Sequence, residues 1–143
     1  MTTELAPGLR HASCVALGDA GILILGRSGS GKSSLALELI GLGAKLVADD
    51  QVELYGEDTG CCARAPAVLQ GLLEARRVGL LQVEFAERAH VRLVIDLDRE
   101  EQERLPPRRV TKFGAQEVDL ILGGNTPNLA IAAKLYVMAG RRH

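Results

Sequence analysis

The segment from residue 26 to residue 33 reads Gly-Arg-Ser-Gly-Ser-Gly-Lys-Ser, a spacing of residue types that suits phosphate binding. Glycines let the backbone curl so that successive N–H groups point at an anion. Lys32 is placed to reach the outer phosphates of a nucleotide, and the Ser33 hydroxyl to ligate magnesium. The sequence therefore predicts a nucleotide-binding phosphate loop made by Gly26, Arg27, Ser28, Gly29, Ser30, Gly31, Lys32, Ser33 and Ser34.

The segments on either side of this loop support the prediction. Residues 21–25 are a short apolar run typical of a buried strand, and residues 34–40 carry apolar side chains at helical spacing. A strand, a glycine-rich loop and a helix in that order are the setting that the motif needs. The helix adds the positive end of its dipole to the anion site. The alternative is a Gly/Ser loop that matches by chance.

Two adjacent acids, Asp49 and Asp50, follow the next predicted strand, residues 44–48. A strand–helix–strand unit has parallel strands, and ligands bind at their carboxyl ends. Both carboxylates are therefore predicted beside the terminal phosphate. Because neighbouring side chains on a strand point to opposite sides, one acid can act as a base and the other can serve the metal. The alternative is a solvated acidic turn, and Asp96, at the end of a predicted strand, is a rival for the metal.

His11 begins an apolar segment, residues 11–17, that predicts a first strand, with a tight turn at Gly18-Asp19. Folding a hairpin about this turn sets Ala16 near Gly21 or Ile22 and brings His11 to the edge of the phosphate loop. A histidine there can contact phosphate or hold a neighbouring side chain. The alternative is an exposed histidine at the start of a strand.

The remaining pattern predicts an α/β, phosphate-loop nucleotide-binding fold with a mixed sheet and inserted β-hairpins, as one domain over residues 1–143. The predicted elements are a hairpin over 52–65, a short helical turn over 69–74, a loop over 84–89, a strand over 91–97, a solvated linker over 98–109, a hairpin over 110–120, and a helix over 127–138 that Gly140 ends.

Composition excludes several functional classes. Lys and Arg number 17 against 18 Asp and Glu, and aromatic residues are 3%, which argues against nucleic acid and anionic membranes as partners. No apolar run approaches the roughly 20 residues of a membrane span, and the N-terminus does not read as a signal peptide. Cys14, Cys61 and Cys62 lack metal-ligand spacing and predict reduced thiols in a cytoplasmic protein.

Taken in order, His11, residues 26–33, Ala48-Asp49-Asp50 and Leu73-Glu74-Ala75-Arg76 resemble the catalytic domain of HPr kinase/phosphorylase, most of all its short alphaproteobacterial form. The resemblance implies transfer of the terminal phosphate of ATP to a serine of the phosphocarrier HPr, or of a nitrogen-system paralogue. It also implies removal of that phosphate by inorganic phosphate, which gives pyrophosphate. The family assembles as a hexamer, so a homo-oligomer is expected.

The resemblance also implies roles for individual side chains. Asp49 is expected to be the base that activates the serine, and Lys32 to stabilise the moving phosphoryl group. His11 is expected to lie by the phosphates or to support Asp49. A catalytic arginine is best matched by Arg104. Magnesium is expected to be held by Ser33, Asp50 and Glu74.

The chain departs from the family pattern at Arg77, which stands where the family usually has a glycine after its Ile-Arg pair. The interval from Glu74 to Arg104 is also shorter than in long family members. Two rival functions remain open: a small-molecule kinase of the same fold class, and a nucleotide-binding regulatory switch without catalysis.

Overall fold

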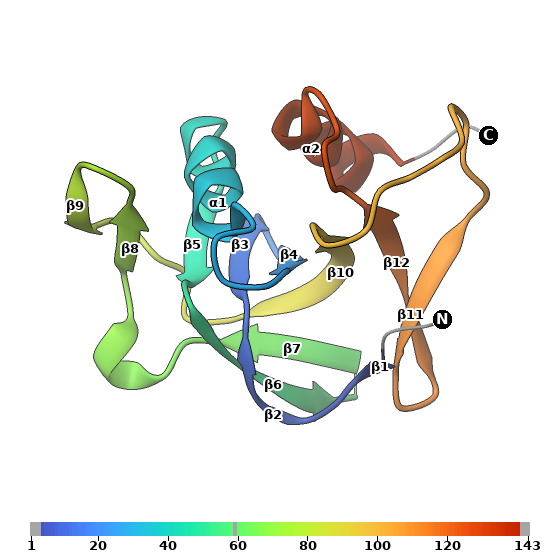
Figure 1. Cartoon of the computed structure of the whole chain (residues 1–143). Coiled ribbons are helices and arrows are strands. Elements are labelled where there is room, and N and C mark those ends of the chain that lie inside the picture. Colours follow the sequence, from blue (N-terminus) through green and yellow to red (C-terminus); the bar gives the residue numbers. More distant parts are fainter. Residues whose placement is uncertain (1–3, 59, 141–143) are drawn as a thin grey trace.

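A computed structural model describes residues 4–58 and 60–140 (Figure 1). A curled sheet carries two helices on one face, while a lower group of strands lies under the other face. The strands are β1 (Glu4–Leu5), β2 (Gly8–His11), β3 (Ser13–Leu17), β4 (Ala20–Leu25), β5 (Lys45–Ala48), β6 (Gln51–Glu57), β7 (Gly60–Arg64), β8 (Leu72–Ala75), β9 (Gly79–Gln82), β10 (Ala89–Asp96), β11 (Arg109–Phe113) and β12 (Gln116–Leu122); the helices are α1 (Lys32–Gly41) and α2 (Leu129–Ala139).

The strand directions confirm the predicted mixed sheet, which runs in the order β1-β11-β12-β10-β4-β3-β5. β4, β10 and β12 are parallel to one another, whereas β3 is antiparallel to both of its neighbours, β4 and β5. The strands on either side of α1 are therefore parallel to each other, but β3 lies between them. Their carboxyl ends still reach the same edge of the sheet, which is where the sequence predicts the site.

Alternate side chains of β4 belong to two different cores. Ile22 and Ile24 pack with the helices, together with Leu35 of α1 and Ala133 of α2. Leu23 and Leu25 join the core between the sheet and the lower strands β6 and β7. A strand buried on both faces needs an unbroken apolar run, which explains why residues 21–25 show no polar alternation.

The predicted first strand is confirmed in its register but is divided at Ala12. β3 forms the expected hairpin with β4, with Ala16 opposite Gly21. His11 belongs instead to β2, which crosses to pair with β6, where it lies opposite Gln51. The hairpins β6–β7 and β11–β12 are present as predicted.

The predicted helical turn over 69–74 is wrong for most of its length. A short 3₁₀ turn covers Ala67–Leu69, and β8 follows and pairs with β9 in a separate hairpin. Burial alternates along β8, with Leu73 and Ala75 buried and Glu74 exposed. That period of two is the pattern of a strand packed on one face, and β8 lies against α1.

Both predicted helices are confirmed, with small differences at their ends. α1 begins at Lys32, and Gly43, just beyond it, has a φ of 107°, as a helix terminus requires. α2 begins at Leu129 rather than at Pro127, because Asn128 takes the N-cap position. Among the described residues, neither helix has the length and apolar character of a membrane span.

Candidate phosphate-binding site

The backbone of residues 26–31 curls between β4 and α1 because glycines stand where other residues do not fit. Gly29 and Gly31 have φ values of 82° and 102°, in the left-handed region. A Cβ atom on Gly26 would collide with the Ser30 side chain. The backbone N–H of Arg27 donates to the Asp98 carboxylate at 3.0 Å, which fixes the start of the loop. α1 then presents its free N-terminal N–H groups to the same space.

Lys32, the first residue of α1, is folded back onto the loop. Its Nζ donates to the carbonyl oxygens of Gly26 at 2.7 Å and Arg27 at 3.0 Å. The side chain is buried, so the ammonium group is held inside the curl of the loop. A cation in this position faces an anion bound by the loop amides.

Asp49 is held by donors from three different elements. Its Oδ1 accepts hydrogen bonds from the hydroxyls of Ser13 in β3 and Ser33 in α1, both at 2.7 Å. Its Oδ2 accepts from the backbone N–H of Glu74 in β8, at 3.1 Å. Only 7% of Asp49 is exposed. The end of β5 is thus tied to the first turn of α1, as the parallel strand–helix–strand prediction requires.

Asp50 lies on the solvent-facing side of the site, with 69% of its side chain exposed, whereas Asp49 is buried. Its backbone has a φ of 70°, in the left-handed region, at the irregular step where β5 runs on into β6 in the same direction, antiparallel to β3 and then to β2. Its Oδ1 lies 3.3 Å from Nδ1 of His11, and Nε2 of the same ring lies 3.4 Å from the Ser28 hydroxyl. A neutral imidazole that donates from Nδ1 accepts at Nε2, so one tautomer satisfies both contacts.

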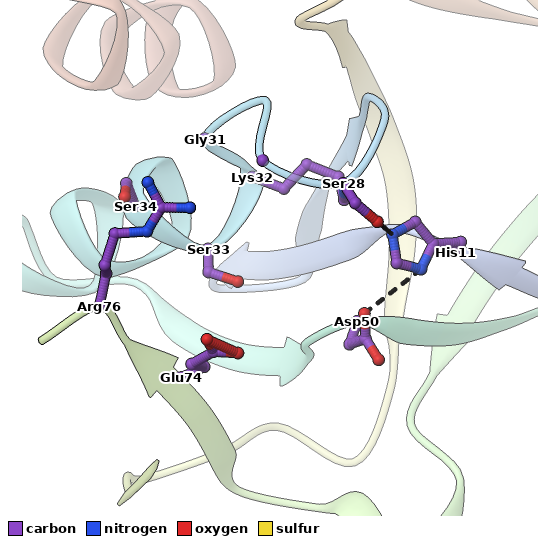
Figure 2. A pocket seen from close by; sticks show the side chains of 10 residues that line it. His11, Ser28, Gly31, Lys32, Ser33, Ser34, Asp50, Glu74 and Arg76 are labelled. Carbon is purple, nitrogen blue, oxygen red and sulfur yellow. Dashed lines mark hydrogen bonds and ion pairs between the residues drawn. The ribbon is translucent and has the colours of Figure 1, made fainter. Parts of the chain in front are cut away.

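These residues surround a hollow of about 280 Å³ beside the loop. Figure 2 shows Ser33 and Glu74 directed at the same space, with Arg76 on the Ser34 side and the His11–Asp50 pair on the Ser28 side. The lining residues are His11, Ser28, Gly29, Gly31, Lys32, Ser33, Ser34, Asp50, Glu74 and Arg76. Six positions of the predicted loop therefore meet predicted residues from β2, β8 and the end of β5.

Arg76 was not predicted as a site residue, although it stands in the motif that ends at Glu74-Ala75-Arg76. Residues two apart along a strand share a face, so a strand over 72–75 directs Glu74 and the residue two positions later to the same side. Because the sequence predicted a helical turn in this segment, the shared face of Glu74 and Arg76 was not predicted. Arg76 adds a second cation to the phosphate hollow.

Two other predicted residues lie elsewhere. Arg104 lines a separate hollow with Glu101, Arg109 and Pro106, and does not join the residues around the phosphate loop. Asp96, the rival metal ligand, accepts a hydrogen bond from the backbone N–H of Asp98 at 2.9 Å. It borders the outer side of the loop near Arg27, whereas Asp49 contacts the Ser33 hydroxyl directly. Asp49, rather than Asp96, is therefore the acid in contact with Ser33, one of the predicted metal ligands.

The donor set fits a nucleotide and magnesium. The oxygens of Ser33, Asp49, Asp50 and Glu74 are hard ligands of the kind that Mg²⁺ takes together with substrate phosphates. The Ser30 hydroxyl is buried within the loop and finds no hydrogen-bond partner among the described residues. A bound phosphate is one group that could supply that partner, since buried polar groups are normally satisfied.

The fold and this site define a phosphate-loop nucleotide-binding protein of the α/β class. A family model described as "HPr Serine kinase C-terminal domain" matches residues 3–141. The chain belongs to this family.

Individual relatives agree with the family match. The HPr kinase/phosphorylase of Caldicellulosiruptor bescii is 36% identical over 145 residues, which cover 94% of this chain and 45% of that protein. The HPr kinase/phosphorylase of Azoarcus sp. strain BH72 is 40% identical over 129 residues, which cover 85% of this chain and 39% of that protein. The chain spans less than half the length of these curated relatives.

A solved structure shares the fold. The HPr(Ser) kinase/phosphatase from Coxiella burnetii superposes with a TM-score of 0.76 at 27% sequence identity. The superposition covers 90% of this chain and 87% of that one. The predicted fold class is therefore confirmed over nearly the whole chain.

Proposed function

We propose that residues 1–143 form one catalytic domain, an ATP-dependent protein-serine kinase/phosphorylase that acts on HPr or a nitrogen-system paralogue. The observation that carries this proposal is the contact between Ser33 of the phosphate loop and Asp49 at the end of β5. An acid held at the terminal-phosphate end of the loop is placed to accept the proton of a substrate hydroxyl or to serve the metal, and phosphoryl transfer needs both tasks. The relatives' printed names supply the substrate class, and the family match covers nearly all of this chain.

The proposed chemistry assigns one task to each group. The loop amides and the N-terminus of α1 bind the phosphates of ATP. Lys32, released from the carbonyls of Gly26 and Arg27, neutralises charge on the phosphoryl group as it moves. Ser33, Asp50 and Glu74 are the proposed magnesium ligands. When bound, Mg²⁺ neutralises the charge that develops between the outer phosphates.

Asp49 is the proposed base that accepts the proton of the substrate serine. Its Oδ1 accepts two serine hydroxyls and its Oδ2 accepts one backbone N–H, which leaves one lone pair on Oδ2 to accept the proton. Asp50 is the alternative base, because 69% of its side chain is exposed and the His11 ring orients it. Under either assignment the second acid of the pair serves the metal, and His11 positions Asp50.

A protein substrate suits the open side of this hollow. Asp50 and His11 are both substantially exposed at its rim, so a serine presented on another protein can approach them. The β8–β9 hairpin supplies Glu74 and Arg76 to the hollow (Figure 2), and its Val78 and Leu80 have exposed side chains. These features favour a phosphocarrier over a small molecule enclosed by a lid.

The test is transfer of the labelled terminal phosphate of ATP to purified HPr and to its nitrogen-system paralogue, each compared with a variant in which the acceptor serine is alanine. Serine-dependent labelling is expected, followed by release of labelled pyrophosphate when inorganic phosphate is added. Labelling that is equal in the serine-to-alanine variant, or ATP binding without any phosphate transfer, would overturn the kinase proposal and favour a regulatory switch.

A further inference from the structure

Three side chains that ligate metals gather away from the phosphate site, where strands β6, β7 and β10 lie side by side. Cys62 on β7 is directly opposite His90 on β10 and opposite Tyr55 on β6. Glu57 follows Tyr55 by two residues on β6, so its side chain shares that face of the sheet. The pairing of three strands therefore brings together residues that are far apart in the sequence.

The ligand atoms of Glu57, Cys62 and His90 all lie within 4.8 Å of one another. The Cys62 thiol donates to Oε1 of Glu57 at 3.3 Å. Cys62 is fully buried, His90 is half-buried and Glu57 is exposed. The cluster is therefore shielded from solvent at Cys62 and accessible to solvent at Glu57. We propose that these three side chains form a zinc-binding site with its fourth position open to water.

Ligand chemistry and spacing both favour zinc. Thiolate, imidazole and carboxylate groups bind Zn²⁺ at about 2.0 to 2.3 Å, and in a tetrahedral site the ligand atoms are then about 3.5 Å apart. The observed cluster needs only small side-chain movements to reach that spacing. Magnesium and calcium prefer oxygen ligands alone, which separates this site chemically from the acidic phosphate hollow.

A nearby cation, Arg88, competes with a metal ion for the Glu57 carboxylate. Arg88 Nη1 lies 3.4 Å from Oε1 of Glu57, and hydrogen bonding to Tyr55 contributes to a raised Arg88 pKa. The Arg88 side chain is 63% exposed, so it can turn toward solvent when an ion displaces it from Glu57. Removing its charge should therefore tighten zinc binding.

This site could not be predicted from the sequence because its ligands lack local spacing. Cys61 and Cys62 are adjacent, and side chains of adjacent strand residues point to opposite faces. Cys61 is part of the core between the sheet and the lower strands, whereas Cys62 lies on the face of His90. Cys61 is thus a matched control for Cys62.

The experiment titrates metal-free protein with Zn²⁺ by calorimetry and with Co²⁺ by absorption spectroscopy, which detects a thiolate ligand. We expect one zinc equivalent and a thiolate-to-cobalt band. Glu57→Gln, Cys62→Ser and His90→Gln should each weaken zinc binding at least about 10-fold. Cys61→Ser and His11→Ala, which alter the buried neighbour and the phosphate site, should leave it unchanged, and Arg88→Gln should tighten it.

Glu57→Gln keeps the proposal testable if a cysteine variant fails to fold, because Glu57 is on the surface. Zinc affinity that is equal in the wild type and Glu57→Gln, or a cobalt spectrum without the thiolate band, would overturn the site. Binding that disappears in His11→Ala but persists in Glu57→Gln would do the same, since it would assign the zinc to the phosphate hollow.

Discussion

The Ser33 hydroxyl donates a 2.7 Å hydrogen bond to Oδ1 of Asp49, and this contact joins the first turn of α1 to the end of β5. The two residues are 16 positions apart, and the rest of α1 and all of β5 lie between them. Because the phosphate loop leads directly into Ser33, the contact sets the distance between the bound phosphates and the acid. Catalysis in our account depends on this distance.

Loss of the Lys32 ammonium group should abolish transfer. Lys32→Ala removes the cation that faces the moving phosphoryl group, and we expect kcat to fall by about 10²-fold or more. The folded state should survive, because the lysine's partners are two loop carbonyls that can turn to water. Thermal unfolding is the control, and a stable variant with wild-type kcat would contradict the assignment.

Glu74 should set the magnesium requirement. Its carboxylate faces Ser33 across the hollow (Figure 2), so Glu74→Ala should raise the Mg²⁺ concentration that gives half-maximal transfer. Glu87→Ala, at an exposed acid that does not line the hollow, is the matched control. If both variants show the same magnesium titration as the wild type, Glu74 has only a structural role.

Arg77 carries a conformational cost that a glycine would remove. Its φ of 68° is in the left-handed region, at the turn between β8 and β9, where the resemblance described above leads us to expect glycine. Arg77→Gly should raise the free energy of unfolding by about 0.5 to 1 kcal/mol, since the left-handed penalty exceeds the entropy that glycine loses. Denaturant titration measures the change, and a destabilised variant would show that the arginine makes compensating contacts.

Cys14 and Cys61 should resist thiol reagents in the folded protein. Burial raises the pKa of Cys14 far above its ordinary value, and burial, with the charge of Cys62, raises the pKa of Cys61 to about 12. A raised pKa keeps both thiols protonated at neutral pH, and the thiolate is the reactive form. Peptide mapping after alkylation of native and unfolded protein tests this. Labelling of native protein at pH 8 as fast as that of unfolded protein would contradict it.

Much of the site could be predicted because its residues follow local rules. The phosphate loop is continuous in sequence, and parallel strands bring Asp49 to the same edge of the sheet as Ser33. The hairpin about Gly18-Asp19 likewise predicted that His11 lies beside the loop, where it contacts Ser28. In each case a single turn or a single helix determines where the residue lies relative to the phosphate loop.

The features that were missed depend on contacts between distant segments. Residues 72–75 form a strand because Leu73 packs against the helix-side core, and that packing cannot be seen in the local pattern. The position of Arg76 follows from the same strand. The cluster of Glu57, Cys62 and His90 arises from pairing among three strands, and its last two members are 28 positions apart in the sequence.

The most direct test of the central claim measures both nucleotide affinity and phosphate transfer to HPr or its paralogue, in the wild type, Asp49→Asn and Asp50→Asn. We predict serine phosphorylation by the wild type. We expect Asp49→Asn to bind ATP nearly as well as the wild type but to transfer phosphate about 10²- to 10⁴-fold more slowly. Loss of turnover only in Asp50→Asn would move the base to Asp50. Undiminished transfer in both variants would contradict the claim that an acid beside the phosphate loop drives the reaction.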